Sequence, residues 1–222
     1  MPDQHELSAF AEVLNSAEKP ILVGGQAVNL WAEHYASAIP ALDPLRPFMS
    51  KDADIFGDRA MADRLAVATN WRLTCYNEPR TIAIAMLTKD VPGKDPLLIE
   101  VINSVNGLTS NDLLDPDILE LRPGQVYRVP SPVILLKAKL ANASQLDQTR
   151  RQDVRHVQML IPCVCEYPAL GPTCVSADES DPEPKEGRSS QIPEKGKHIP
   201  DWSLDDFLHG QTPPAKDREL EL

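Results

Sequence analysis

The sequence has no run of apolar residues long enough to form a membrane helix, which needs roughly 20 such residues. Its first residues, 1–6, also lack the basic and then apolar layout of a signal peptide. These absences predict a cytoplasmic protein with no membrane partner. Cysteine is scarce as well, with four in 222 residues. A disulfide framework of the kind found in secreted domains is therefore not expected, and reduced thiols are.

A positive net charge is also missing, because 22 lysines and arginines face 33 aspartates and glutamates, for a formal charge of -11. Such a balance excludes a protein whose whole surface attracts nucleic acid or anionic lipid. It leaves room for a local basic patch. Any binding of an anionic partner is therefore expected at a defined site.

Proline, by contrast, is abundant, with 21 residues that are concentrated in loops and toward the end of the sequence. Residues 168–222 combine many prolines and charged residues with few large apolar ones, a composition that cannot offset the entropy cost of ordering. We therefore predict a folded domain over residues 1–167 and a largely disordered acidic tail over 168–222. Within the tail, residues 202–210 have the capping and apolar spacing of a short helical motif.

A short apolar run, 21–23, is followed by Gly24 and Gly25 and then by apolar residues at helical spacing. This pattern predicts a strand, a glycine turn and a helix. Two glycines in this place have two interpretations. They can simply form a tight turn, or they can let backbone N–H groups approach a phosphate at the positive end of the helix dipole.

Two carboxylates, Asp52 and Asp54, lie one residue apart in the segment 50–56, which has the pattern of a strand. Alternation on a strand would put both on one face, where they repel each other unless a divalent cation such as Mg²⁺ binds them. A third acid, Glu100, interrupts the apolar strand predicted over 97–102. An unpaired buried carboxylate is costly, so Glu100 is expected to face a cavity, a cation or a metal ion.

Two helices are predicted in the later part of the domain. The first begins at Ser131 and Pro132, which are a capping residue and a first-turn proline, and its inward residues are expected to be Leu135, Leu136 and Leu140.

The second helix is predicted over residues 149–161, with Val154, Val157 and either Leu160 or Ile161 as its apolar stripe. Three arginines on it, Arg150, Arg151 and Arg155, form either a solvated face or, with the nearby lysines, a basic patch for an RNA acceptor.

The order of these motifs resembles the nucleotidyltransferase superfamily, which has the polymerase-beta-like fold, and most closely its AbiEii-type branch of bacterial toxins. The resemblance spans roughly residues 18–161. It is carried by the stretches GGQAVNLWAEHY, PFMSKDADIFGD, LLIEVIN and SPVILLKAKLANASQLDQTRRQD. It implies an α/β (α+β) fold in which a small mixed sheet is flanked by helices.

The resemblance also implies roles for individual residues. Gly24, Gly25 and Ser50 would hold the triphosphate. Asp52 and Asp54 would bind two Mg²⁺ ions, or Mn²⁺ in their place, with Glu100 as the third carboxylate. Lys139 and Asp153 would face the nucleotide. The chain departs from the family's usual Lys/Arg-Asp-x-x-Asp segment, because residues 152–156 read Gln-Asp-Val-Arg-His.

The implied activity is transfer of an NMP from an NTP to an acceptor, which would be RNA, with tRNA as one candidate, or a protein. The implied setting is a toxin-antitoxin or phage-defence system, with an antitoxin as partner. One alternative is a degenerate member that binds nucleotide or a partner without turnover. A glycosyltransferase would share the Asp-x-Asp motif, but it needs a larger doubly wound domain than this length allows.

Overall fold

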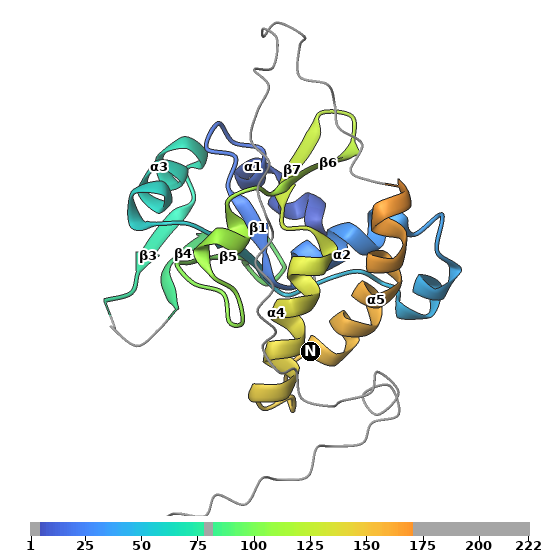
Figure 1. The fold of residues 1–222 in the computed structure, drawn as a ribbon. Helices are drawn as coiled ribbons and strands as arrows, with labels where there is room; N and C mark the ends of the chain where they lie inside the picture. Colours follow the sequence, from blue (N-terminus) through green and yellow to red (C-terminus); the bar gives the residue numbers. More distant parts are fainter. Residues whose placement is uncertain (1–4, 78–81, 171–222) are drawn as a thin grey trace, which may run out of the picture. The chain divides into compact units, whose positions relative to one another are not determined.

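A mixed sheet of seven strands runs through the part of the chain that the computed structural model describes, residues 5–77 and 82–170 (Figure 1). In sequence order the strands are β1 (Ile21–Val23), β2 (Ala53–Phe56), β3 (Arg72–Cys75), β4 (Ala83–Lys89), β5 (Leu97–Ile102), β6 (Asp117–Arg122) and β7 (Gln125–Val129). In space their order is β3-β4-β5-β2-β1-β7-β6. Strand β2 runs parallel to β5 and antiparallel to β1.

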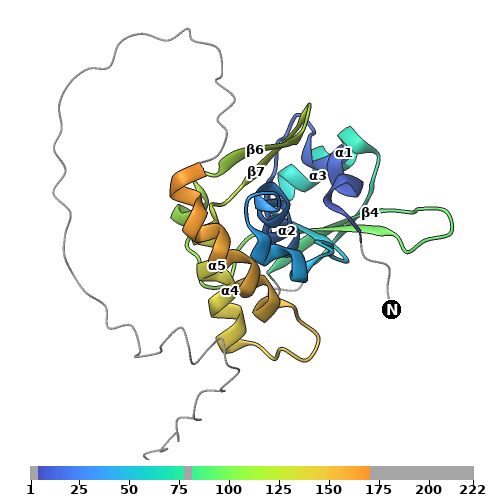
Figure 2. The ribbon, with the colours of Figure 1, turned by 90° about the vertical axis from the view of Figure 1, so that its right-hand side faces the viewer.

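Helices flank this sheet, so the predicted α/β class with a mixed sheet is confirmed. The α-helices are α1 (Ala11–Leu14), α2 (Gly24–Tyr35), α3 (Arg59–Thr69), α4 (Pro132–Gln145) and α5 (Asp153–Leu170), and 3-10 helices cover Leu7–Phe10, Pro40–Leu45 and Ser110–Leu113. Helices α4 and α5 lie side by side in both ribbon views (Figures 1 and 2). No helix in the described ranges is long and apolar enough to cross a membrane.

The main hydrophobic core lies on one face of the central strands. Alternation along β2 and β5 turns Ile55, Ile99 and Val101 into this core, where they are fully buried. Helix α2 packs on the same core through Trp31, whose indole N–H donates to the carbonyl of Pro130 over 2.9 Å. The alternate residues of the same strands therefore face the other side of the sheet, where the acids of the two strands lie.

Helix α4 begins as predicted, with Ser131 as its cap, but its buried face differs from the predicted one. The Ser131 hydroxyl oxygen accepts from the backbone N–H of Ile134 over 3.4 Å. Leu140, predicted to point inward, is 39% exposed, and its neighbour Lys139 is buried instead. The reason is an ion pair between Lys139 and Asp153 on α5, which fixes the rotation of α4.

Helix α5 is displaced from its predicted limits. Residues before Asp153 form a turn, in which Asp147 accepts from the backbone N–H of Thr149 over 3.0 Å. Its apolar stripe includes Val157 and Leu160, both fully buried, whereas Val154, predicted to be in the stripe, is 41% exposed.

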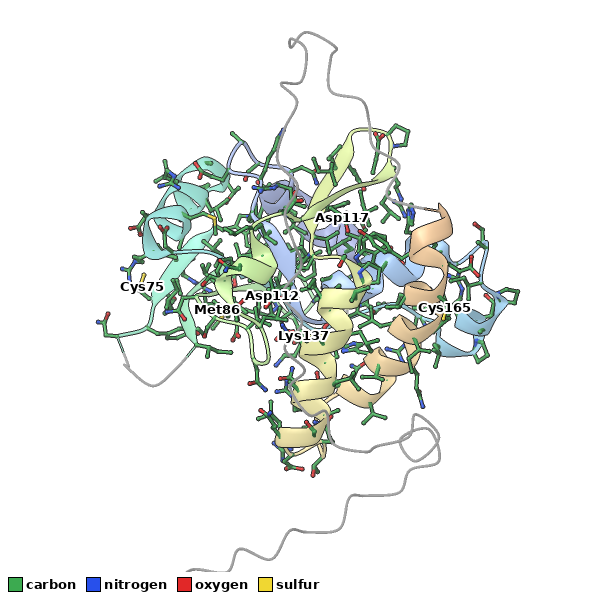
Figure 3. The ribbon with its side chains drawn as sticks, in the orientation of Figure 1. Cys75, Met86, Asp112, Asp117, Lys137 and Cys165 are labelled. Atoms are coloured by element: carbon green, nitrogen blue, oxygen red, sulfur yellow. The ribbon has the colours of Figure 1, made fainter. Side chains whose placement is uncertain are left out.

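The same helix continues beyond the predicted end at residue 161, because packing of its later turns outweighs the helix-breaking tendency of Pro162. The Tyr167 hydroxyl donates to Asp117 at the start of β6, over 3.0 Å, and its ring packs edge-on against Trp31. Figure 3 shows Asp117 above helix α4 and level with the upper end of α5. The helix thus includes residues 168–170, which were assigned to the tail, while 171–222, with the motif predicted at 202–210, lie outside the described residues.

Candidate functional site

All eight residues to which the resemblance gives a role line one cavity of about 430 Å³. They are Gly24, Gly25, Ser50, Asp52, Asp54, Glu100, Lys139 and Asp153. Ile82, Val105, Asn106, Asn142, Leu146, Arg150, Arg151 and His156 are among the other lining residues. The fold therefore brings together positions that span almost 130 residues of sequence, from Gly24 to Asp153.

Three carboxylates, Asp52, Asp54 and Glu100, form one side of the cavity, which we call the acidic wall. Asp54 and Glu100 are paired positions on the parallel strands β2 and β5, so their side chains leave the same face of the sheet next to each other. The predicted strand over 50–56 is shorter than expected, because β2 begins at Ala53 and Asp52 lies in the bend before it. Asp52 thus reaches the wall from a bend and not by strand alternation.

The charges of the acidic wall repel one another. Burial, together with the charges of Asp52 and Glu100, raises the pKa of Asp54 to about 7. Burial and the charge of Asp52 also raise the pKa of Glu100, against a smaller opposite effect of Lys51. Within the described residues none of the three carboxylates forms a salt bridge. In this part of the chain the negative charge of the wall is therefore not balanced by an ion pair, although Lys139 and Arg151 act on Asp54 from a longer distance.

The two glycines open helix α2 directly after β1, with no intervening turn. Gly24 has φ +68°, a left-handed conformation that favours glycine, and a Cβ there would lie 1.9 Å from Oδ2 of Asp54. A Cβ on Gly25 would lie 3.1 Å from Oγ of Ser50. Val23, which precedes the helix, provides no side-chain cap. The first-turn N–H groups of α2 therefore reach the cavity wall without a capping side chain.

Ser50, which lies beside Gly25, is held in place by backbone contacts with His5. It forms a two-way bridge with His5, with N···O distances of 2.8 and 3.2 Å. The side-chain amide of Gln26, in the first turn of α2, donates to the carbonyl of His5 over 2.9 Å. These contacts fix the backbone of Ser50 next to the start of α2, with its hydroxyl beside Gly25.

Lys139, Arg151 and Asp153 form a second side of the cavity, which we call the ion-pair wall. Lys139 Nζ lies 3.0 Å from Oδ1 of Asp153, and the two side chains are 8% and 2% exposed. Arg151 Nε lies 2.5 Å from Oδ2 of the same carboxylate. Burial alone would raise the pKa of Asp153, but the charges of Lys139 and Arg151 outweigh it and lower the pKa to about 2. Lys139 and Asp153 thus line the cavity while bonded to each other.

The arginines after α4 do not all form a solvated face. Arg155 donates to the backbone carbonyls of Leu45 and Pro47, so it anchors the proline-rich loop before β2 to helix α5. Arg151 bonds to Asp153, and Arg150 lies at the cavity.

Sequence reasoning gave no role to His156, which also lines the cavity. It lies three residues after Asp153, one turn along the same helical face, and that spacing is a signal that could have identified it.

The acidic wall fits a divalent ion, for which a pair of carboxylates would be the ligands. Mg²⁺ commonly binds one or two carboxylates together with substrate phosphates and water. Asp54 and Glu100 provide such a pair, and a cation would relieve the repulsion that raises their pKa values. Over residues 5–77 and 82–170, no group of three or more His, Cys, Asp or Glu side chains is arranged so that it could hold a metal ion.

Comparison of the sequence with protein-family models gave no match, and comparison with curated proteins gave none either. The site is therefore interpreted from its own geometry and chemistry.

Proposed function

We propose that this protein is a metal-dependent nucleotidyltransferase that transfers an NMP from an NTP to an RNA or protein acceptor. One observation carries the proposal: the start of helix α2 and the acidic wall meet at Gly24, where a Cβ would lie 1.9 Å from Asp54. A helix N-terminus attracts anions, and neighbouring carboxylates repel them. The two features would be compatible if the carboxylates held a divalent cation, because its charge would offset theirs.

In this proposal, the first-turn N–H groups of α2 and the Ser50 hydroxyl bind the triphosphate. Asp54 and Glu100 are the pair that would hold Mg²⁺, together with the substrate phosphates, while Asp52 adds negative charge beside them. When bound, Mg²⁺ would neutralise charge on the α-phosphate and on the leaving pyrophosphate. The acceptor hydroxyl oxygen bonds to the α-phosphorus as the bond to the pyrophosphate oxygen breaks. The proton of the acceptor hydroxyl passes to one of the three carboxylates of the acidic wall.

Two further parts of the cavity support a nucleotide substrate. Ile82, Val105 and Leu146 give the lining an apolar portion, which suits the face of a base. Arg150 and Arg151 bring positive charge to the cavity of a protein whose formal charge is -11, which suits a phosphodiester acceptor such as RNA. The resemblance extends the proposal to a toxin of a bacterial toxin-antitoxin or phage-defence system, acting in the cytoplasm with an antitoxin as partner.

A second function is favoured by the ion-pair wall. Lys139 and Asp153, which the resemblance assigns to the nucleotide, are bonded to each other and buried. A purely structural role, in which the pair holds α4 against α5, is enough to explain this contact. A module that binds a nucleotide or a partner without turnover would keep this pair and the cavity.

The two functions are separated by a labelling experiment. The protein is incubated with Mg²⁺, each labelled NTP in turn, and total cellular RNA or protein. We expect one NTP to label one class of acceptor, and Asp52→Ala or Asp54→Ala to abolish the labelling. Asp63→Ala, which removes an exposed acid on α3 that pairs with Arg59, is the matched control and should keep full labelling.

Labelling that survives both substitutions would contradict the transferase. If NTP binds but no acceptor from either class is labelled, the binding module is the better account.

A further inference from the structure

His156 lies on the first turn of α5 and is 5% exposed, with its ring at the start of helix α2. A Cβ on Gly25 would lie 3.2 Å from Cε1 and 3.7 Å from Nε2 of this ring. The same Cβ position is 3.1 Å from the Ser50 hydroxyl oxygen. The imidazole, the hydroxyl and the first-turn N–H groups of α2 therefore meet at one point of the cavity.

Both ring nitrogens of His156 are buried, and neither has a hydrogen-bond partner among the residues that the structure describes. Buried polar atoms are bonded in the great majority of cases, so a ring with two unbonded nitrogens needs an explanation. The imidazole is neutral, because burial and the charges of Lys139, Arg155 and Arg151 lower the pKa of His156 to about 3, despite the opposite effect of Asp153. It therefore has one N–H donor and one bare nitrogen acceptor.

The surroundings of His156 favour an anionic partner for that N–H group. The N-terminus of α2 has no side-chain cap, and its dipole attracts negative charge. Lys139 and Arg151 lie on the adjoining ion-pair wall. A phosphate group placed at Gly25 would accept from the backbone N–H groups, from Ser50 and from the imidazole together.

We propose that His156 is a phosphate-binding residue, which donates its ring N–H to an oxygen of the triphosphate bound at the start of α2. This inference rests on the proposed function, because it names a further contact to the same substrate. In the free protein the imidazole is already positioned at the start of α2. Because its nitrogens are buried without hydrogen bonds to the described residues, they lower the stability of the free protein.

This role predicts opposite effects of one substitution on binding and on stability. His156→Leu removes no hydrogen bond from the free protein and replaces an unbonded polar ring by an apolar side chain of similar size, so Tm should rise by about 2–4 °C. The same variant should bind sodium tripolyphosphate at least about 10-fold more weakly, because a hydrogen bond to a charged group is lost. His156→Gln keeps an N–H donor, so its affinity for tripolyphosphate should lie between those of the unmodified protein and His156→Leu.

The experiment measures both quantities for the full chain, with tripolyphosphate affinity from calorimetry at fixed Mg²⁺ and Tm from thermal unfolding. His34→Leu is the matched control, because His34 lies at the far end of α2 from the glycines and packs against Trp31. It should leave the affinity unchanged.

An unchanged affinity with a lowered Tm in His156→Leu would show a structural histidine and overturn the inference, while the proposed function would stand. Absence of tripolyphosphate binding by the unmodified protein would overturn both. Weakened binding by His156→Leu in a protein that transfers no nucleotide would support the inference and remove the transferase proposal alone.

Discussion

The acidic wall and the ion-pair wall border the same cavity, and each contains an aspartate, the half-buried Asp54 in one and the buried Asp153 in the other. The pKa values of these two aspartates depart from the ordinary value in opposite directions. The pKa of Asp54 is raised to about 7, and that of Asp153 is lowered to about 2. Burial raises both pKa values. The difference comes from the neighbours, because Asp54 faces Asp52 and Glu100, whereas Asp153 bonds to Lys139 and Arg151.

This difference indicates which wall is structural and which is available to a ligand. In the ion-pair wall the carboxylate of Asp153 is bonded to both Lys139 and Arg151, so the wall stabilises the contact between α4 and α5. The acidic wall keeps negative charge that no side chain balances through a salt bridge in the described ranges. We infer that the balance is completed by a cation in the working protein.

The largest effect is expected from breaking the ion-pair wall. Lys139→Met leaves Asp153 buried with Arg151 as its remaining ion-pair partner, so the free energy of unfolding should fall by about 3–5 kcal/mol. Lys139→Met with Asp153→Leu removes both buried charges and should recover most of that loss. Urea denaturation at pH 7 measures both variants. A double variant that is no more stable than the single one would show that the two charges are not coupled.

A smaller effect, of opposite sign, is expected on the acidic wall. The pKa of Asp54 is about 7 in the folded protein and about 4 when unfolded, so the folded state holds an extra proton between these values and loses stability as pH rises through them. Asp54→Asn removes this penalty. In EDTA it should raise the free energy of unfolding by about 2–4 kcal/mol at pH 8 and by almost nothing at pH 4. A stabilisation that does not depend on pH would contradict the raised pKa.

The smallest effect is expected for an ion pair on the exposed side of α4. Lys137 Nζ lies 3.0 Å from Oδ2 of Asp112, and the lysine side chain is 50% exposed (Figure 3). Lys137→Ala should change the free energy of unfolding by less than about 1 kcal/mol, because exposed pairs contribute little. Comparison with Lys139, two residues away, isolates the effect of burial. A loss as large as that of Lys139→Met would contradict this account of the two lysines.

The parts of the site that lie in local patterns could be predicted from the sequence. Gly24 and Gly25 follow an apolar strand, and Glu100 interrupts another, so each was visible within a few residues. Asp54 and Glu100 were each predicted to lie on a strand, but that the two strands pair at these positions is known only from the structure. Asp52 reaches the cavity although the reason given for it, alternation along a strand, was wrong.

The remaining parts depend on contacts between elements that are distant in sequence. Apolar spacing predicts that a helix has a buried stripe, but it did not give the rotation of α4 or α5, so Leu140 and Val154 were placed inward. Burial of Lys139 follows from its pairing across the helix contact with Asp153. The role inferred for His156 depends on the approach of α5 to the start of α2, which no local pattern contains.

The central claim is that the acidic wall binds a divalent cation together with a nucleotide. Calorimetry with a nonhydrolysable NTP, with Mg²⁺ and with EDTA, tests it most directly in the unmodified protein and in Asp54→Asn. The account predicts binding that requires Mg²⁺ and becomes at least about 10-fold weaker in Asp54→Asn, while Lys137→Ala binds normally. Equal affinity in Mg²⁺ and EDTA, or an unchanged affinity in Asp54→Asn, would contradict it.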